Sequence, residues 1–558
     1  MNCIETIAEI LKREGVTTLF CYPTTPVIEA AAAAGIRPVL CRQERVGVDM
    51  ASGYARVQNG RPPAVFAMQY GPGVENAFAG IATAYSDATP ILLLPLGHPR
   101  QHAQIFPLFK STRSLASVTR SAEDIVLPQY TEGVMRRAFS NLKNGRGGPV
   151  AVEIPLDVAN KDTGVETLSY QPVRESKSAA DWKDVEAAAE LLLQARCPVI
   201  QAGQGVLYAG ATDELVELAE LLQMPVYTSV DGKSAFPETH PLSLGTAGLV
   251  FTGQGQAFFH QCDVVFGVAA SLTHHPITQP PLPAGKRVIH LTHEPRDLNK
   301  SYHAEVGLLG DAKLVLRQLI TALRDRLKGT PRSHNAAVDI ARHRDAWLAK
   351  WQATLDSRQT PISPYQVISE FARLVPADDA IVTHDSGSPR DQMLPFYRAG
   401  KPRSYLGWGK SHQLGTGLGL TIGAKLAAPE KFCVNFMGDA AFGMTGLDFE
   451  TAVRNDAPIC TIVMNNSTMA IETKTMQKSH ALYGTRDIGG NYAAIARDLG
   501  GWGLRVDDPA KVAKAIEEAR RRTQDGQACL LEFITGAETA FSHRFGAAEA
   551  GEPQPAAG

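Results

Sequence analysis

The sequence predicts an α/β fold of three domains, each built on a parallel sheet. Short, continuous apolar runs recur along the chain, and such runs are typical of strands buried on both faces of a parallel sheet. Longer segments with the periodicity of amphipathic helices separate these runs, which is the alternation of βαβ units. The chain has 558 residues, which is too long for a single hydrophobic core.

The predicted strands fall into three groups along the chain. The apolar runs that define them are 62–69, 89–97 and 148–155, then 197–203, 262–269 and 286–292, and finally 379–385, 431–438, 458–465 and 528–535. Polar stretches near 160–182 and 326–362 separate the groups and are predicted linkers. The predicted domains are therefore 1–160, 182–327 and 362–540, followed by a flexible tail of small residues over 541–558.

Composition argues against several classes of protein. The formal net charge is −2 and no block of Lys and Arg stands out, so no nucleic-acid surface is expected. No apolar run reaches the roughly 18 residues of a membrane span, and residues 1–15 have helical spacing rather than a signal-peptide core. The 8 cysteines form no CxxC pair, so neither a zinc site nor a disulfide framework is indicated. We expect a cytoplasmic protein without nucleic-acid or membrane partners.

Two predicted strands of the third domain lead into polar residues. The run 431–438 is followed by Asp439, and the run 458–465 ends in Asn465 and is followed by Asn466. Ligands of parallel α/β sheets bind at the carboxyl ends of the strands, so these side chains are expected to face one site. A carboxylate, an amide oxygen and a backbone carbonyl suit Mg²⁺, which completes its shell with phosphate oxygens and water. The small residues after Asp439 also let backbone N–H groups approach a phosphate.

The spacing of these residues resembles a known motif. Twenty-five residues separate Asp439 from Asn465, and Gly-Asp followed at this distance by Asn-Asn resembles the metal–diphosphate motif of thiamine-diphosphate (ThDP) enzymes. Ala440 replaces the final Gly of the family's Gly-Asp-Gly. The resemblance implies that Asp439, the Asn466 side chain and the Thr468 carbonyl ligate Mg²⁺. It also implies cofactor contacts at Gly438, Ala440, Ala441 and Met469.

A second segment, near the N-terminus, resembles the same family. Residues 37–60 read RPVLCRQERVGVDMASGYARVQNG and resemble the family's Glu-containing segment before Gly-Tyr-Ala-Arg. The resemblance implies that Glu44 lies against a ring nitrogen of the cofactor's aminopyrimidine and is the catalytic carboxylic acid. A carboxyl group in an apolar setting has a raised pKa, which suits this role. Gln43 stands where the family usually has His.

Further segments resemble the acetolactate-synthase-like branch of the ThDP enzymes. They are a Gly-Pro-Gly segment, an Asp-x-Gly loop and a Gly-rich loop, at 71–73, 385–387 and 407–427. The resemblance implies that Gly387 and Ser388 contact the diphosphate. It also implies that the His412 carbonyl accepts a hydrogen bond from the pyrimidine amino group, and that Leu414 wedges the cofactor into its bent form.

The resemblance implies a ThDP- and Mg²⁺-dependent carboligase or synthase that acts on a small 2-oxo acid through a decarboxylated enamine intermediate. The alternative is a ThDP lyase, either a 2-oxo acid decarboxylase similar to benzoylformate decarboxylase or a 2-hydroxyacyl-CoA lyase that takes an acyl substrate. A third hypothesis is a non-catalytic, cofactor-binding relative, which the presence of Glu44, Asp439 and Asn466 disfavours.

The substrate side departs from the acetolactate synthases. Thr24 and Thr25 stand where that branch has two glycines, and Phe106 and Pro107 stand where it has Phe-Gln. Together with Lys410, these residues are the candidate substrate contacts. A cationic Lys410 inside the pocket would favour an anionic substrate.

The remaining expectations concern the central domain and the assembly. Gly203-Gln204-Gly205 begins like a dinucleotide fingerprint, but Tyr208 stands where the last Gly belongs, so FAD, ADP and no nucleotide all stay open. Glu44 and Asp439 lie in different predicted domains. The resemblance implies that they meet across the interface of a homodimer, and that homotetramers are also common.

Overall fold

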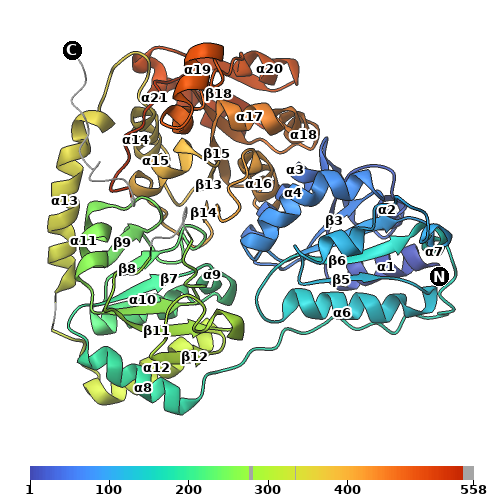
Figure 1. Ribbon diagram of the computed structural model, residues 1–558, viewed down its shortest axis with the longest axis horizontal. Helices are drawn as coiled ribbons and strands as arrows, with labels where there is room; N and C mark the ends of the chain where they lie inside the picture. The colour runs from blue at the N-terminus through green and yellow to red at the C-terminus, as the bar shows by residue number, and fades with distance from the viewer. Residues whose placement is uncertain (276–280, 334, 545–558) are drawn as a thin grey trace.

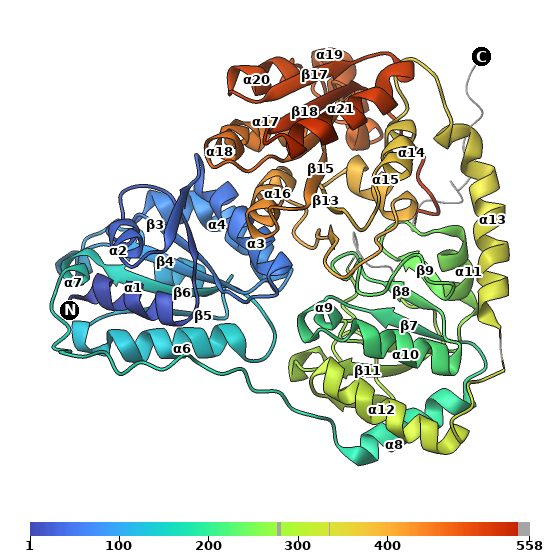
Figure 2. The ribbon, with the colours of Figure 1, turned by 180° about the vertical axis from the view of Figure 1, so that it is seen from behind.

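The computed structural model describes residues 1–275, 281–333 and 335–544, and it contains three sheets of six strands each (Figure 1). Every strand pair within these sheets is parallel. Helices flank each sheet, as Figures 1 and 2 show from opposite sides. The predicted α/β class with three parallel sheets is therefore confirmed.

The N-terminal sheet has the strand order β2-β1-β3-β4-β6-β5. Its strands are β1 (Thr18–Cys21), β2 (Arg37–Leu40), β3 (Ala64–Met68), β4 (Ile91–Gly97), β5 (Ser121–Asp124) and β6 (Val150–Pro155). Its helices are α1 (Cys3–Arg13), α2 (Val27–Ala33), α3 (Glu44–Val57), α4 (Pro72–Ser86), α5 (Ser111–Leu115), α6 (Thr131–Lys143) and α7 (Leu156–Ala159). Every residue of β3 and β4 is buried, as their continuous apolar character predicts.

The central sheet has the strand order β12-β11-β10-β7-β8-β9. Its strands are β7 (Pro198–Ala202), β8 (Val226–Thr228), β9 (Ser243–Thr246), β10 (Val264–Val268), β11 (Arg287–Thr292) and β12 (Val306–Leu309). Its helices are α8 (Trp182–Gln194), α9 (Gly205–Ala209), α10 (Thr212–Leu222), α11 (Gly253–Gln261) and α12 (Ala312–Leu327). Helix α13 (Ala336–Leu355) follows, within the stretch predicted as the second linker.

The C-terminal sheet has the strand order β14-β13-β15-β16-β18-β17. Its strands are β13 (Ala380–His384), β14 (Tyr405–Leu406), β15 (Phe432–Gly438), β16 (Cys460–Asn465), β17 (Trp502–Val506) and β18 (Cys529–Ile534). Its helices are α14 (Pro364–Leu374), α15 (Ser388–Phe396), α16 (Thr416–Ala427), α17 (Asp439–Thr445), α18 (Phe449–Arg454), α19 (Gln477–Tyr483), α20 (Tyr492–Asp498) and α21 (Val512–Gln524).

The strands predicted from sequence are the inner strands of the three sheets. They form β3, β4, β6, β7, β10, β11, β13, β15, β16 and β18. The strands without a prediction lie at or next to the sheet edges, namely β1, β2, β5, β8, β9, β12, β14 and β17. Several of these are short or partly exposed, so they lack the continuous apolar run that marks a central strand.

The N-terminal and C-terminal sheets are joined through α3 and α16, which lie side by side in both views (Figures 1 and 2). Glycines permit this close approach. A Cβ atom added at Gly423 would lie 1.9 Å from the Met50 carbonyl oxygen, and one at Gly53 would lie 2.1 Å from the Leu420 carbonyl oxygen. One hydrophobic core runs continuously across this contact, because it includes Phe66 of β3 and Cys433 of β15.

Helix α13 fastens the C-terminal segment to the rest of the chain. It packs against α11 and α14, and Trp347 of α13 stacks on Phe396 with ring centroids 5.0 Å apart. The Trp347 indole Nε1 donates to Ser542 Oγ at 2.9 Å, and Ser542 Oγ donates to the Phe251 carbonyl at 2.6 Å. The predicted flexible tail is thus wrong at its beginning, since Phe541 and Ser542 are buried. Residues 545–558 of that prediction lie outside the described residues.

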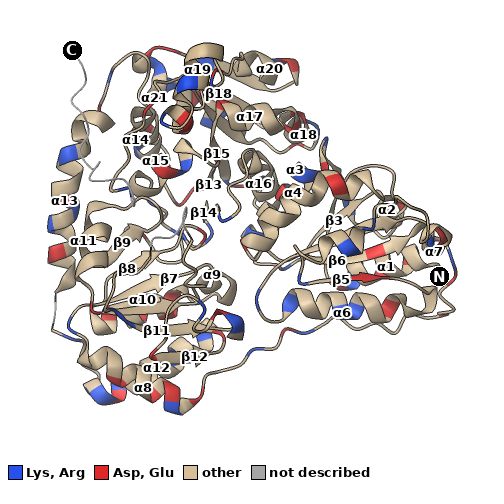
Figure 3. Ribbon diagram, in the orientation of Figure 1, with Lys and Arg blue, Asp and Glu red and all other residues tan. Residues whose placement is uncertain are grey.

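Charged side chains of both signs are interspersed over the three domains (Figure 3). This distribution agrees with the small net charge of the sequence. Among the described helices, none is both long enough and apolar enough to cross a bilayer.

We expect Gly423→Ala to destabilise the junction of the N-terminal and C-terminal domains, because its Cβ meets backbone that cannot rotate away. Overpacking of this kind costs about 1–3 kcal/mol, so the midpoint of thermal unfolding should fall by several degrees. Gly133→Ala in α6 is the control, since its Cβ would meet only the Arg137 guanidinium at 3.6 Å. Equal midpoints for the two variants would show that the α3–α16 contact is not tight.

Candidate active site

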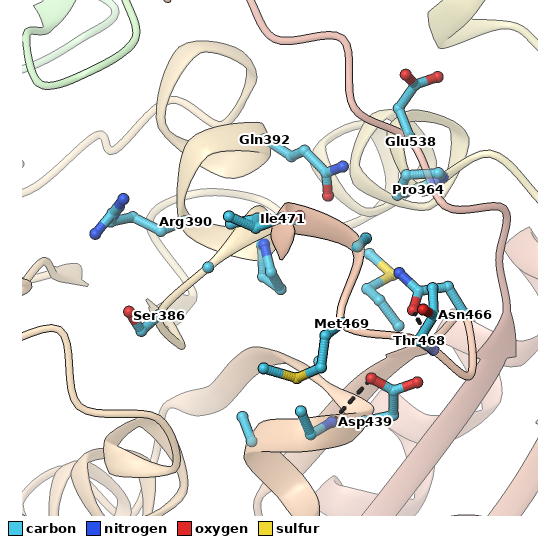
Figure 4. A pocket seen from close by; sticks show the side chains of 18 of the residues that line it. Pro364, Ser386, Arg390, Gln392, Asp439, Asn466, Thr468, Met469, Ile471 and Glu538 are labelled. Atoms are coloured by element: carbon cyan, nitrogen blue, oxygen red, sulfur yellow. Dashed lines mark hydrogen bonds between the residues drawn. The ribbon is translucent and has the colours of Figure 1, made fainter. Parts of the chain in front are cut away.

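A cavity of about 330 Å³ opens at the carboxyl ends of β13, β15 and β16 (Figure 4). The segments that follow these three strands border it, together with the loop that precedes α16. Its lining includes all the cofactor residues predicted in the third domain: Gly387, Ser388, His412, Leu414, Gly438, Asp439, Ala440, Ala441, Asn466 and Met469. The described residues that line it all come from the C-terminal domain.

Asp439 is fixed between two strand ends. It is the first residue of α17 and is only 3% exposed. One carboxylate oxygen accepts from the Ala440 N–H at 2.8 Å, and the other accepts from the Ser467 N–H at 2.7 Å, beyond β16. Burial raises the pKa of Asp439, and the surrounding backbone N–H groups oppose that rise. The carboxylate therefore bridges the loops that follow β15 and β16.

The two asparagines after β16 face in different directions and have different partners. The Asn465 amide donates to Glu532 Oε1 on β18 at 2.7 Å, inside the sheet. The Asn466 Oδ1 accepts from the Thr468 N–H at 3.0 Å and lines the cavity. Ser467 between them has a positive φ of 56°, which turns the chain back over the strand ends. Glu532 was not predicted from sequence, where it is one acidic residue within an apolar run.

The donors gathered here fit a magnesium ion shared with a diphosphate. Asp439 offers a carboxylate, Asn466 an amide oxygen and Thr468 a carbonyl and a hydroxyl that is buried without a hydrogen-bond partner. Among the described residues no three His, Cys, Asp or Glu side chains come together as a metal site. A metal at this place would hence need oxygen ligands from a bound anion, as Mg²⁺ commonly takes from phosphates.

A buried carboxylate joins two loops that border the cavity. Asp385 follows β13 and accepts from the backbone N–H groups of Ser386, Gly415 and Gly417 at 2.8, 2.8 and 2.9 Å. Burial raises the pKa of Asp385 to about 6, although these N–H groups act in the opposite direction. Gly387 then adopts a φ of 94° and is the N-cap residue of α15. Gly387 and Ser388 line the cavity, so the N-terminal end of α15, which favours an anion, borders it.

His412 and Leu414, from the loop before α16, also line the cavity. His412 has a positive φ of 56°, and its Nδ1 accepts from Arg390 Nη1 at 3.1 Å. Burial lowers the pKa of His412 to about 4, and the Arg390 guanidinium adds to that effect. The Leu414 carbonyl accepts from the guanidinium of Arg45 in α3. Arg390 was not predicted as a site residue, because its position in the segment has no counterpart in the motif.

Glu44 lies at the start of α3, and its side chain is 2% exposed. Its Oε1 is buried without a hydrogen-bond partner, and burial raises its pKa against the opposing effect of its own N–H and of Asn76. Arg45, the next residue, reaches the Leu414 carbonyl, so the start of α3 adjoins the Gly-rich loop before α16. Within one chain, however, Glu44 does not line the cavity that holds Asp439.

The predicted substrate residues lie away from this cavity in one chain. Thr24 has a φ of 75°, Thr25 is buried, and the Phe106 side chain before Pro107 is 93% exposed. Lys410 pairs with a carboxylate of the central domain, Asp231, at 2.7 Å. None of these five candidate positions lines the cavity, and their contact with substrate stays a prediction.

The glycine turn of the central domain packs against the chain's own backbone. The Gly203 N–H donates to the Val268 carbonyl at 2.9 Å, and the Gly205 N–H donates to the Ala269 carbonyl at 3.1 Å. A Cβ atom at Gly203 would lie 2.3 Å from the Ala269 carbonyl oxygen, so this packing requires glycine there. The cavity beside the turn encloses about 50 Å³.

Three family models match the chain in the order of its sheets. They describe the thiamine pyrophosphate enzyme N-terminal TPP binding domain over residues 1–117, the central domain over 185–319 and the C-terminal TPP binding domain over 385–533.

Similar proteins align over nearly the whole chain. A probable acetolactate synthase large subunit of Methanocaldococcus jannaschii is 27% identical and covers 93% of this chain and 90% of its own. Acetolactate synthase isozyme 3 large subunit of Escherichia coli is also 27% identical, with 96% and 95% covered. Sulfoacetaldehyde acetyltransferase of Castellaniella defragrans is 30% identical, with 93% and 90% covered. The chain belongs to the thiamine pyrophosphate (ThDP) enzyme family, in its acetolactate-synthase-like branch, and is a ThDP-dependent enzyme of C–C bond chemistry.

Proposed function

We propose that the chain is a ThDP- and Mg²⁺-dependent carboligase that decarboxylates a small 2-oxo acid and joins the remaining fragment to a second carbonyl compound. The observation that carries the proposal is the set of oxygen donors from Asp439, Asn466 and Thr468 at the adjoining ends of two parallel strands. The acetolactate synthases among its relatives, which align over nearly the full length, support a 2-oxo acid as the substrate.

The C-terminal domain would bind the diphosphate end of the cofactor. Asp439, Asn466 and the Thr468 carbonyl would ligate Mg²⁺, and the metal would hold two phosphate groups. The backbone N–H groups of Gly387 and Ser388, at the start of α15, would bind the same anion from the other side. The buried carboxylate of Asp385 supports this arrangement because it ties the α15 loop to the loop before α16.

The N-terminal domain would supply the acid. When bound, ThDP provides a nucleophilic carbon and an electron sink, which allow a 2-oxo acid to lose CO₂. Glu44 would hold a proton at a ring nitrogen of the aminopyrimidine. Its unpartnered Oε1 and the burial that raises its pKa both favour the protonated over the charged form of the carboxyl group.

We further propose that the enzyme is a homodimer or homotetramer whose active site is shared between two copies. The cavity of one chain is lined by its C-terminal domain alone, among the residues described. Glu44 of a second copy would complete it, and the exposed Phe106 and its neighbour Pro107 would reach the same site. Thr24 and Thr25 lie in the same domain as Glu44 and would approach with it.

We expect Asp439→Asn to weaken Mg²⁺-dependent ThDP binding by at least about tenfold, because the amide replaces the single carboxylate of the ligand set. Calorimetric titration with ThDP at fixed Mg²⁺ measures this affinity. Asp456→Asn is the matched control, since Asp456 is exposed, adopts a positive φ that Asn tolerates, and lies outside the cavity. Unchanged affinity in Asp439→Asn would refute the assigned metal site.

Heteromers of two inactive variants test the shared site. Glu44→Gln and Asp439→Asn chains, co-expressed with different tags and purified through both, should regain about half of the wild-type activity per dimer. One site of such a dimer carries both substitutions and the other carries neither. A site built within one chain would leave the heteromer inactive. The Glu29→Gln chain, altered at an exposed residue of α2, is the control and should stay active.

The reaction is tested with pyruvate, benzoylformate and a 2-hydroxyacyl-CoA, each with and without an added aldehyde or 2-oxo acid acceptor. We expect CO₂ release from pyruvate together with a C–C ligation product, detected by mass spectrometry, and loss of both when Mg²⁺ is removed by chelation. A free aldehyde as sole product would instead establish the decarboxylase alternative. Cleavage of the acyl-CoA would establish the acyl-CoA lyase.

A further inference from the structure

A group of basic side chains borders the cavity away from the metal ligands. Arg390 of α15 is 4% exposed yet lines the cavity, as do His412 and Arg544. In Figure 4, Arg390 lies near Ser386, on the opposite side of the view from Asn466. A buried guanidinium needs partners, so its surroundings indicate what it binds.

The guanidinium of Arg390 is held by two hydrogen bonds. Its Nε donates to Asp391 Oδ1 at 2.8 Å, and its Nη1 donates to His412 Nδ1 at 3.1 Å. A guanidinium carries five N–H donors in a planar fork. Nη2 donates to no group among the described residues, so the orientation is fixed while donors remain for a ligand. Such a fork suits a planar, two-oxygen anion.

Arg390 shares its carboxylate partner, Asp391, with a second guanidinium group. Asp391 is fully buried and serves two cations, because Arg544 Nη2 lies 3.9 Å from its other oxygen. His412 is neutral at pH 7 for the reason given above. Glu472 and Glu538 also line the cavity, where each accepts a hydrogen bond within its own segment, from Thr475 Oγ1 and from the Ala540 N–H, both at 2.7 Å. Beside Arg390 itself, one carboxylate faces two guanidinium groups, so one positive charge is left unpaired there.

Arg390 belongs to the first turn of α15, next to the proposed diphosphate ligands Gly387 and Ser388. Its guanidinium nevertheless reaches His412 and points away from Asp439 and Asn466 in Figure 4. His412, which Arg390 contacts, belongs to the loop that is assigned to the pyrimidine and thus to the reacting end of the cofactor. The ring of His275, from the central domain, lies 5.3 Å from the His412 ring. The Arg390 guanidinium therefore faces the space where substrate, rather than diphosphate, would be bound.

We propose, resting on the proposed function, that Arg390 is the residue that selects an acceptor bearing a fixed negative charge. A guanidinium paired with the carboxylate that leaves as CO₂ would stabilise the ground state and oppose its loss. A guanidinium paired with an anionic group that survives the reaction carries no such cost. Arg390, oriented by His412 and Asp391, thus binds the carboxylate or sulfonate of the second substrate and orients its carbonyl group for attack.

The kinetic test uses the ThDP- and Mg²⁺-loaded full-length enzyme with pyruvate as donor. Glyoxylate serves as the anionic acceptor and propanal as the neutral one. In Arg390→Gln, kcat/KM for glyoxylate should fall roughly ten- to 100-fold, the range for a charge-assisted hydrogen bond. The value for propanal and the KM for pyruvate should stay within about twofold, and Arg390→Lys should recover part of the loss. Equal losses for both acceptors, or a raised KM for pyruvate alone, would overturn the proposal.

A binding measurement keeps this inference separate from the proposed reaction. Calorimetric titration of the loaded enzyme with oxamate, an unreactive anion, and with neutral pyruvamide needs no turnover. Oxamate affinity should fall at least about tenfold in Arg390→Gln, while pyruvamide and ThDP affinities stay unchanged. Arg373→Gln, an exposed position on α14, should behave as wild type.

The outcomes of this titration are distinct. If the wild-type enzyme ligates no acceptor but oxamate binding depends on Arg390, the proposed reaction fails and the anion site stands. If the wild-type enzyme does not bind oxamate, or Arg390→Gln binds it equally well, the anion site is refuted. A weakened ThDP affinity in Arg390→Gln would instead assign Arg390 to the diphosphate.

Discussion

The parallel pairing of β15 with β16 is the constraint on which the site depends. Gly438 lies opposite Met464 in this pairing, so the chain leaves both strands at the same level of the sheet. Asp439 can then reach the N–H of Ser467 across the gap. A slip of one residue would turn each side chain to the other face of the sheet and separate these groups. Asn465 helps to hold this register, because its side-chain amide donates a hydrogen bond to the buried Glu532 of the next strand, β18.

The inner strands, and the residues of the third domain that line the cavity, could be predicted from the sequence because their signals are local. A strand buried on both faces reads as a continuous apolar run, and β3, β4 and β15 show this plainly. Asp439 and Asn466 were found through their fixed spacing along one strand–helix–strand unit. The edge strands β2 and β5 carry no such run, since one side of each meets solvent or loops, and their positions follow from pairing with inner neighbours.

Other parts of the site depend on contacts between distant segments, which no local pattern encodes. Asp385 begins the Asp-x-Gly loop noted in the sequence, but only folding brings it to the N–H groups of Gly415 and Gly417. In the sequence, Arg390 is followed by Asp391 on a helix, and such a pair of opposite charges is typical of an exposed surface. Its burial beside His412 follows from the packing of α15 under the loop before α16. Such residues acquire their surroundings from tertiary structure, so sequence alone assigns them no partner.

The ion pair of Lys410 with Asp231 ties the loop before α16 to the central domain. Lys410 precedes His412 and Leu414 in the same loop, and its ammonium group lies 2.7 Å from the Asp231 carboxylate, in the turn after β8 of the central domain. The salt bridge is largely shielded from solvent, and the Lys410 ammonium helps to lower the pKa of Asp231 to about 2. A small rotation of the central domain would thus move His412 and Leu414, which line the cavity. The central domain would in this way help to set the position of Leu414, whether or not it binds a nucleotide of its own.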